Sequence, residues 1–270
     1  MQREQGLVEK GSIRMLGWQI FVHSVRMVFG NLKQVLQIVV VPALAGFLLA
    51  ATSFWITGVP LEVFDDSASG LPADVSSASY TAFMMLLVLS VALTGAWMVI
   101  AWHRYVLLEE YPRGMVPPFR VSQVFNYVGR WALLILIVVA ILILPFGIIN
   151  ALANSLPLIV ILVLYLLLVL GVAICFFRLA IVLPSTAIGK QPKFSEAWAA
   201  TEGSNGTVLT MIVVLFLFQL VVQLVFSAAL LVPLFGPLLV LFATFLIIPM
   251  INISILTTMY GIFVEKRELS

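Results

Sequence analysis

The chain has 270 residues, of which 63% are hydrophobic and only 10% are charged. Because a soluble domain carries roughly 25% charged residues, this composition excludes an ordinary soluble globular protein and indicates a membrane protein. The 14 Lys and Arg and 12 Asp and Glu give a net charge of only +2, which argues against a nucleic-acid partner.

Six segments lack any Asp, Glu, Lys or Arg, and each is long enough to cross ~30 Å of hydrocarbon as a helix. In chain order they cover residues 34–56, 81–102, 131–150, 156–177, 207–232 and 237–263. The runs lack the alternating polar positions of a barrel strand, and helices satisfy every backbone N–H and C=O in lipid. We therefore predict an all-α, polytopic membrane protein with six transmembrane helices in a single domain, residues 1–270.

The segment before the first run has a polar stripe. Gln19, His23 and Arg26 recur at intervals of three or four on a helix that is otherwise apolar, which predicts an amphipathic helix in the membrane interface. We predict similar lead-in helices before the third run, at residues 120–132, and before the fifth, where Ser195 is the expected N-cap. The first 12 residues have no apolar stretch of the kind that predicts a cleavable signal peptide.

All Lys and Arg residues precede the first run, lie between the second and third or the fourth and fifth, or follow the sixth. The opposite connections contain none, and the long one near residues 57–80 carries only acidic charges: Glu62, Asp65, Asp66 and Asp74. Since Lys and Arg are retained on the cytoplasmic side, we predict that both ends of the chain are cytoplasmic.

The chain also contains an internal repeat. The pattern G-x-x-P-x-F follows the second run at residues 114–119 and the fourth run at residues 189–194. After each pattern, about twelve residues precede the next apolar run. We predict three repeats, each an interfacial amphipathic helix followed by a transmembrane hairpin, over approximately residues 12–108, 119–183 and 194–265.

Several stretches resemble a known family. L-P-x-x-A-I-G at residues 183–189 and A-W-x-x-T-x-G at residues 197–203, with Arg178 at the end of an even-numbered run, resemble bacterial six-span inner-membrane proteins. Those proteins are related to the membrane domain found beside glycerophosphoryl diester phosphodiesterases. The resemblance implies a bacterial inner (plasma) membrane and helical hairpins. It implies no catalytic residues, because the catalytic barrel of such fusions is a separate soluble domain.

Side chains suited to catalysis or metal binding are sparse. His23 and His103 lie outside the six runs, where we expect interfacial positions, and neither has the spacing of a zinc site. The charged group at residues 109–113 is typical of a solvated helix end. Cys175 is the one cysteine, so an intramolecular disulfide is impossible. The sequence therefore predicts no catalytic residue, no metal and no cofactor.

The apolar runs contain neutral polar residues but no Asp, Glu, Lys, Arg or His, which disfavours ion-coupled transport. Gln219 and Gln223 lie one turn apart in the fifth run, and Asn252 lies in the sixth. These three residues are candidates for a polar path through the protein. Interhelical hydrogen bonds, worth ~0.6 kcal/mol each on average, are the favoured interpretation.

Seven cations form a predicted basic collar on the cytoplasmic side: Arg26, Arg104, Arg120, Arg130, Arg178, Lys190 and Lys193. The collar either binds anionic lipid head groups or only sets the topology. The favoured function is a non-enzymatic protein that organises membrane lipids, a membrane-protein partner or its own oligomer. The alternatives are a transporter or channel for an apolar or amphipathic solute, and a lipid-modifying enzyme with its site at the collar.

Overall fold

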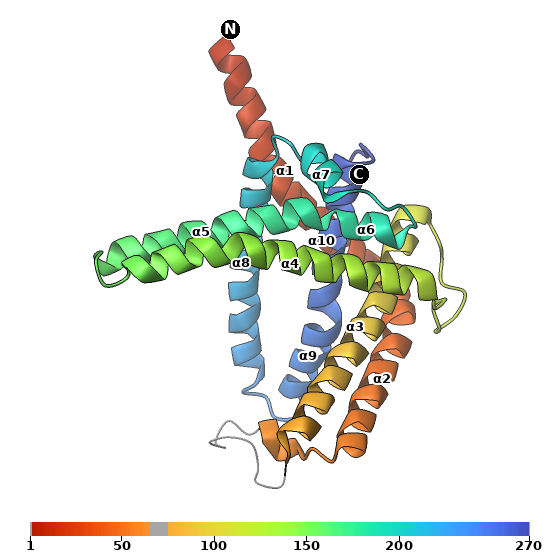
Figure 1. Cartoon of the computed structure of the whole chain (residues 1–270). Helices are drawn as coiled ribbons and strands as arrows, with labels where there is room; N and C mark the ends of the chain where they lie inside the picture. Colours follow the sequence, from red (N-terminus) through yellow and green to blue (C-terminus); the bar gives the residue numbers. More distant parts are fainter. Residues whose placement is uncertain (1, 65–74, 270) are drawn as a thin grey trace. The chain divides into compact units, whose positions relative to one another are not determined.

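A computed structural model describes residues 2–64 and 75–269, with side chains from residue 16 onward. Within this part of the chain every element is a helix, and six helices are long and apolar enough to cross a membrane. Each of them matches one predicted run: four runs lie wholly within their helix, and runs 156–177 and 207–232 extend two and three residues past a helix end, so the chain is a multi-pass α-helical membrane protein (Figure 1). The residues fall into two compact units: unit 1 is Met1–Leu32 with Gly129–Ser270, and unit 2 is Lys33–Val128.

Unit 2 is built on a hairpin of α2 (Leu32–Thr57) and α3 (Ser77–Leu108), with the short helix η1 (Leu61–Phe64) after α2. A Cβ on Gly46 would lie 2.8 Å from the Thr94 hydroxyl, so this glycine lets the two helices touch. Closer to η1, the centroid of the Phe83 ring lies 4.5 Å from that of Phe54 and 6.0 Å from that of Phe64. The acidic residues Asp65, Asp66 and Asp74 of the predicted exterior loop lie outside the described residues.

In unit 1, α1 (Gln2–Gly30) packs against α8 (Asn205–Ala229) and α10 (Ile248–Phe263). Gly17 faces the α8 backbone, and an added Cβ would lie 2.5 Å from the Thr207 carbonyl oxygen. Further along α1, the ring centroids of Phe21 and Phe218 are 5.2 Å apart. The Ser24 hydroxyl lies 3.1 Å from that of Thr258 on α10. One face of α1, with small and apolar side chains, is therefore part of the bundle.

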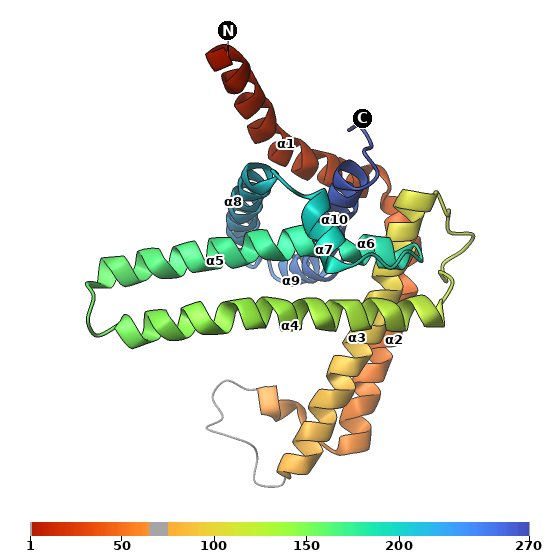
Figure 2. The same cartoon turned by 45° about the horizontal axis from the view of Figure 1, so that its top comes forward.

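Unit 1 continues with α4 (Val121–Leu152) and α5 (Leu158–Ala180), although the first turns of α4 belong to unit 2. The two helices run side by side as an antiparallel hairpin in both views (Figures 1 and 2). The short helices α6 (Val182–Ala187) and α7 (Phe194–Ala200) follow and lead into α8. Only residues 153–157 connect the two helices, so the third and fourth runs form a hairpin.

The sixth span is one continuous helical path made of three pieces: α9 (Phe235–Phe242), the wider π-turn η2 (Ala243–Ile247) and α10. The Ile248 N–H bonds to the Ala243 carbonyl, five residues back. Pro249 follows directly, and it has no N–H for the carbonyl four residues before it. The π-turn is the local adjustment expected beside such a proline.

The lead-in segments differ from one another. The second is not a separate helix: it is continuous with the third span in α4, because no residue between 121 and 131 interrupts the helix. The third is α7, whose N-cap is Lys193 and not Ser195; the Glu196 carboxylate accepts from the Lys193 N–H at 3.1 Å. The first is α1, separated from α2 by Asn31 alone. The threefold repeat and the interfacial placement of these segments stay predictions.

Buried side chains of unit 1 gather toward one end. Helix α6 is buried over its whole length, and α10 is buried from Thr257 to Gly261. By contrast, no residue of α8 after Met211 is buried. The buried segments adjoin connections that carry Lys and Arg, so unit 1 packs most tightly near its basic connections and exposes apolar side chains elsewhere.

Candidate functional site

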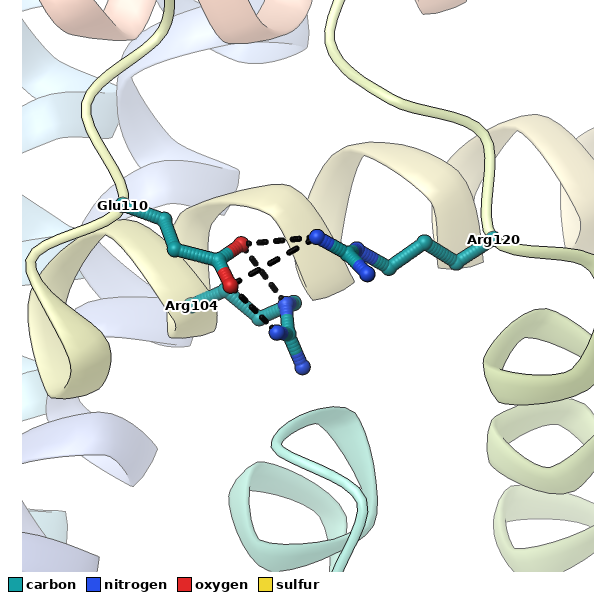
Figure 3. A network of polar contacts seen from close by, with 3 residues as sticks. All are labelled: Arg104, Glu110 and Arg120. Carbon is teal, nitrogen blue, oxygen red and sulfur yellow. Dashed lines mark hydrogen bonds and ion pairs between the residues drawn. The ribbon is translucent and has the colours of Figure 1, made fainter.

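The C-terminus of α3 positions a charged cluster in unit 2, which we call the Glu110 cluster: Arg104, Glu110 and Arg120 (Figure 3). Glu109 ends α3 in the left-handed conformation (φ 55°), and the reversal lets the Glu110 N–H approach the Arg104 carbonyl at 3.4 Å. The Glu110 carboxylate therefore lies beside the Arg104 guanidinium.

Both guanidiniums of the cluster bind the same carboxylate. Arg104 Nε donates to Glu110 Oε2 at 2.8 Å, and its Nη2 pairs with Oε1. Arg120 Nη2 lies 3.2 Å from Oε2. The hydrogen bond from Arg104 is the main cause that holds the pKa of Glu110 below its usual range. With two cations and one carboxylate, the cluster keeps a net positive charge.

The loop after the cluster exposes large apolar side chains. Tyr111, Met115, Val116 and Phe119 are all exposed. The loop is held in place because Trp97 Nε1 donates to the Pro117 carbonyl at 3.0 Å and the Trp97 ring packs 5.2 Å from the Phe119 ring. Exposed aromatic and apolar groups beside arginines are typical of segments at a membrane interface.

Unit 1 contains a second cluster with the same charge ratio, the Glu265 cluster: Lys190, Glu265 and Arg267. Lys190 Nζ lies 3.4 Å from Glu265 Oε1, and Arg267 Nη2 lies 2.7 Å from Oε2. The Tyr260 hydroxyl accepts from Lys190 at 3.3 Å, and this contact raises the pKa of Lys190 above its usual value. Here too, two cations share one carboxylate.

Arg178, another residue of the predicted collar, is buried and serves the corner between α7 and α8. Its Nε donates to the Thr201 hydroxyl at 3.0 Å, Nη1 to Asn205 Oδ1 at 2.9 Å, and Nη2 to the Trp198 carbonyl at 2.9 Å. The guanidinium also lies over the Trp198 ring, 3.6 Å from its centroid. Three of the five Arg N–H donors are thus used inside the protein, and we assign Arg178 a positioning role.

The other collar residues are more accessible. Arg26 is exposed on the face of α1 opposite the packed one, and Lys193 is exposed at the start of α7. Arg130 is half-buried on α4, and its guanidinium lies 5.9 Å from the centroid of the Phe194 ring. The structure therefore distributes the collar between two clusters, one buried clamp and three separate cations.

Gln219, Gln223 and Asn252, the polar-path candidates, are all exposed. The side chains of the two glutamines and the asparagine have no hydrogen-bond partner within the described part of the chain. The described residues therefore do not gather these amides into a shared polar network, and the transport alternative stays a prediction.

His103 differs from its expected interfacial position, because α3 extends beyond the predicted run and buries the imidazole fully, with the Tyr127 ring 6.1 Å away. The charged group after it also differs: Glu110 pairs with Arg104 and Arg120 and not with Arg113. Across residues 2–64 and 75–269, no group of three His, Cys, Asp or Glu side chains is placed to hold a metal ion.

Sequence spacing missed the Arg178 clamp and the sharing of Glu110, because both depend on how the chain turns after a helix end. The A-W-x-x-T-x-G stretch was the available signal for the clamp, since Trp198 and Thr201 lie within it.

Comparisons with family models, with curated proteins and with solved structures find no match, so the family resemblance stays an expectation.

Proposed function

We propose that this protein is a non-enzymatic membrane protein of the bacterial inner membrane that binds anionic phospholipids at its cytoplasmic basic side. The observation that carries the proposal is the excess of cations in its charged clusters. The Glu110 cluster and the Glu265 cluster each combine two cations with one carboxylate. A phosphate group of a lipid complements such a charge.

The surroundings of the clusters support a lipid ligand. The loop after Glu110 exposes Tyr111 and Phe119 beside the arginines, and Trp131 and Trp198 are exposed on the helices that follow the two basic connections in the sequence. Trp and Tyr are enriched at the level of lipid head groups because their rings are amphipathic. A head group bound at Arg104 and Arg120 therefore has apolar protein surface next to its acyl chains.

The size of the effect follows from the number of cations involved. Each Lys or Arg near an anionic surface contributes about 1 kcal/mol, so the one excess cation of a cluster favours an anionic over a zwitterionic lipid by about 1 kcal/mol. This corresponds to roughly a fivefold preference. The preference should weaken as ionic strength rises, because Arg120 and Glu110 are partly exposed to screening.

The test uses the full-length protein in mild detergent with added phospholipid. We expect phosphatidylglycerol to raise the thermal unfolding midpoint and phosphatidylcholine to raise it much less, because a ligand that binds only the folded state stabilises it. The double variant Arg104→Gln, Arg120→Gln should lose the part of the difference that the Glu110 cluster contributes, and the Glu265 cluster should keep the remainder. An arm with inorganic phosphate separates recognition of a lipid from recognition of a free anion.

The matched control is Lys33→Gln, Arg113→Gln, which removes two exposed cations of unit 2 outside the cluster. It should keep the phosphatidylglycerol effect. The single variant Arg120→Gln covers the case in which the double variant does not fold, because Arg120 is more exposed than Arg104. Equal effects of the two lipids on the unaltered protein, or equal losses in the variant and its control, would contradict the proposal.

A further inference from the structure

Helix α8 carries an exposed seam with a coiled-coil spacing. Residues along it are separated by four, three, four, three and four positions, and all are exposed. They are Leu209, Val213, Phe216, Leu220, Gln223 and Ser227. Alternating steps of three and four define the heptad contact positions through which two helices pack side by side.

The seam carries polar groups at membrane depth. Gln223 belongs to the seam, and Gln219 lies beside it one turn earlier, about 6 Å away along the axis and near the centre of the apolar run 207–232. Within the described part of the chain, neither amide has a side-chain hydrogen-bond partner. Hydrocarbon offers no donor or acceptor to an exposed amide. The two glutamines therefore need a partner that supplies hydrogen bonds at this depth.

A different face of α8 makes the contacts inside unit 1. Thr207 and Met211 are buried, and a Cβ on Gly17 of α1 would lie 2.9 Å from the Met211 backbone nitrogen. The Phe218 ring packs against the Phe21 ring of α1 in a tilted arrangement, with 5.2 Å between centroids. Because these positions lie on another side of the helix axis, the seam stays available after the unit has folded.

We infer that the seam is the contact surface between two copies of this chain, paired through Gln223 with Gln219 beside it. Two copies inserted with the same topology place their α8 helices parallel. In a parallel pair with heptad packing, equivalent contact positions face each other, so Gln223 meets Gln223 of the second copy. An amide has both donors and an acceptor, so the pair is self-complementary.

The amides set how strongly the copies associate, because apolar side chains gain little by leaving lipid for another apolar surface. An interhelical hydrogen bond in a membrane contributes on average a factor of roughly three, and at most about fifteen, to an association constant. Two bonds between facing Gln223 amides thus contribute roughly tenfold. Polar pairs of this kind also fix the register of two helices.

The first experiment tests the geometry by disulfide formation in bilayers. Replacing the one native cysteine, Cys175→Ala, leaves a full-length chain in which a single new cysteine can cross-link only to another molecule. We expect Gln223→Cys to form a disulfide dimer rapidly under mild oxidation. Val225→Cys is the matched control, since it is exposed on another side of α8 and should cross-link much less.

The second experiment measures dimer dissociation by energy transfer between labelled full-length chains diluted into phosphatidylcholine vesicles. The variant Gln219→Leu, Gln223→Leu should dissociate at least about tenfold more readily than the unaltered chain. Val221→Ala, Val225→Ala removes exposed side chains away from the seam and should leave dissociation unchanged. A monomer at every protein-to-lipid ratio, equal cross-linking at residues 223 and 225, or unchanged dissociation of the glutamine variant would overturn the inference.

Discussion

The close approach of α1 to α8 at Gly17 predicts that a larger residue at this position destabilises the protein. A methyl group on Gly17 would lie 2.5 Å from the Thr207 carbonyl oxygen and 2.9 Å from the Met211 nitrogen. Both are backbone atoms in the first two turns of α8, so they cannot rotate away as the end of a flexible side chain does. Gly17→Ala should therefore force the two helices apart at their contact.

The magnitude follows from two opposing terms. Replacing Gly by Ala in a helix interior stabilises the helix by about 1 kcal/mol. Forcing an extra methyl group into a packed contact costs about 1–3 kcal/mol. Gly171 in α5 supplies the control, because an added Cβ there has no atom within 4 Å. Gly17→Ala and Gly171→Ala share the helix term, so their difference isolates the steric cost of about 1–3 kcal/mol.

The assay is reversible unfolding of the full-length protein in detergent, with each variant compared to the unaltered chain. We expect Gly171→Ala to be neutral or slightly more stable, and Gly17→Ala to be less stable than Gly171→Ala by about 1–3 kcal/mol. If the two variants agreed within about 0.5 kcal/mol, which is the scatter of harmless substitutions, α1 would not pack against α8 at this point.

Three further predictions follow from the charged residues. Arg178→Gln should lower the free energy of unfolding by at least about 2 kcal/mol in the same assay, because it leaves three acceptors without their charged donor. The control Lys193→Gln should change the free energy of unfolding by less than about 0.5 kcal/mol. The pKa of Glu110 is lower in the folded than in the unfolded protein, so its ion pairs stabilise the folded state fully above the unfolded pKa of about 4.3, and this stabilisation is lost as the pH falls through the folded pKa. The difference in thermal unfolding midpoint between the unaltered chain and Glu110→Gln should therefore persist at pH 5. Loss of this difference between pH 7 and pH 5 would refute the assignment. In a chain without its native cysteine, an impermeant maleimide applied to cells should label Glu62→Cys but not Lys190→Cys, and labelling of both from outside would exclude the predicted topology.

The spans were predictable from the sequence because lipid imposes a simple requirement on composition. A run without charge of about 20 residues identifies a helix that can cross, and each of the six runs coincides with such a helix to within three residues at the ends of runs 156–177 and 207–232. Their ends were less predictable. The third span begins at Val121 and not near residue 131, because the polar residues before Trp131 continue the same helix. Charge marked where the apolar run began, but backbone hydrogen bonding determined where the helix began.

The candidate site was predictable in its side-chain types but not in its connections. The sequence identified Arg104, Arg120 and Lys190 as cations on one side, yet it did not show which carboxylate each one meets. That depends on the left-handed turn at Glu109, which brings Glu110 back toward Arg104. Arg178 shows the same limit, because its acceptors lie more than 19 residues away in sequence, and no helical or strand period links positions so far apart.

Unit 1 packs most tightly near its basic connections for a physical reason. Between helices in lipid, burial of apolar side chains gives little net attraction, so close packing depends on small residues and on polar contacts. Both are concentrated where α1 meets α8 and α10: Gly17 permits the approach, and Ser24 bonds to Thr258. Farther along α8, Leu, Val and Phe can face lipid at no cost, but Gln219 and Gln223 cannot do so without losing hydrogen bonds. The same requirement that makes the basic end compact therefore makes the exposed glutamines the part of α8 that most needs a second protein surface.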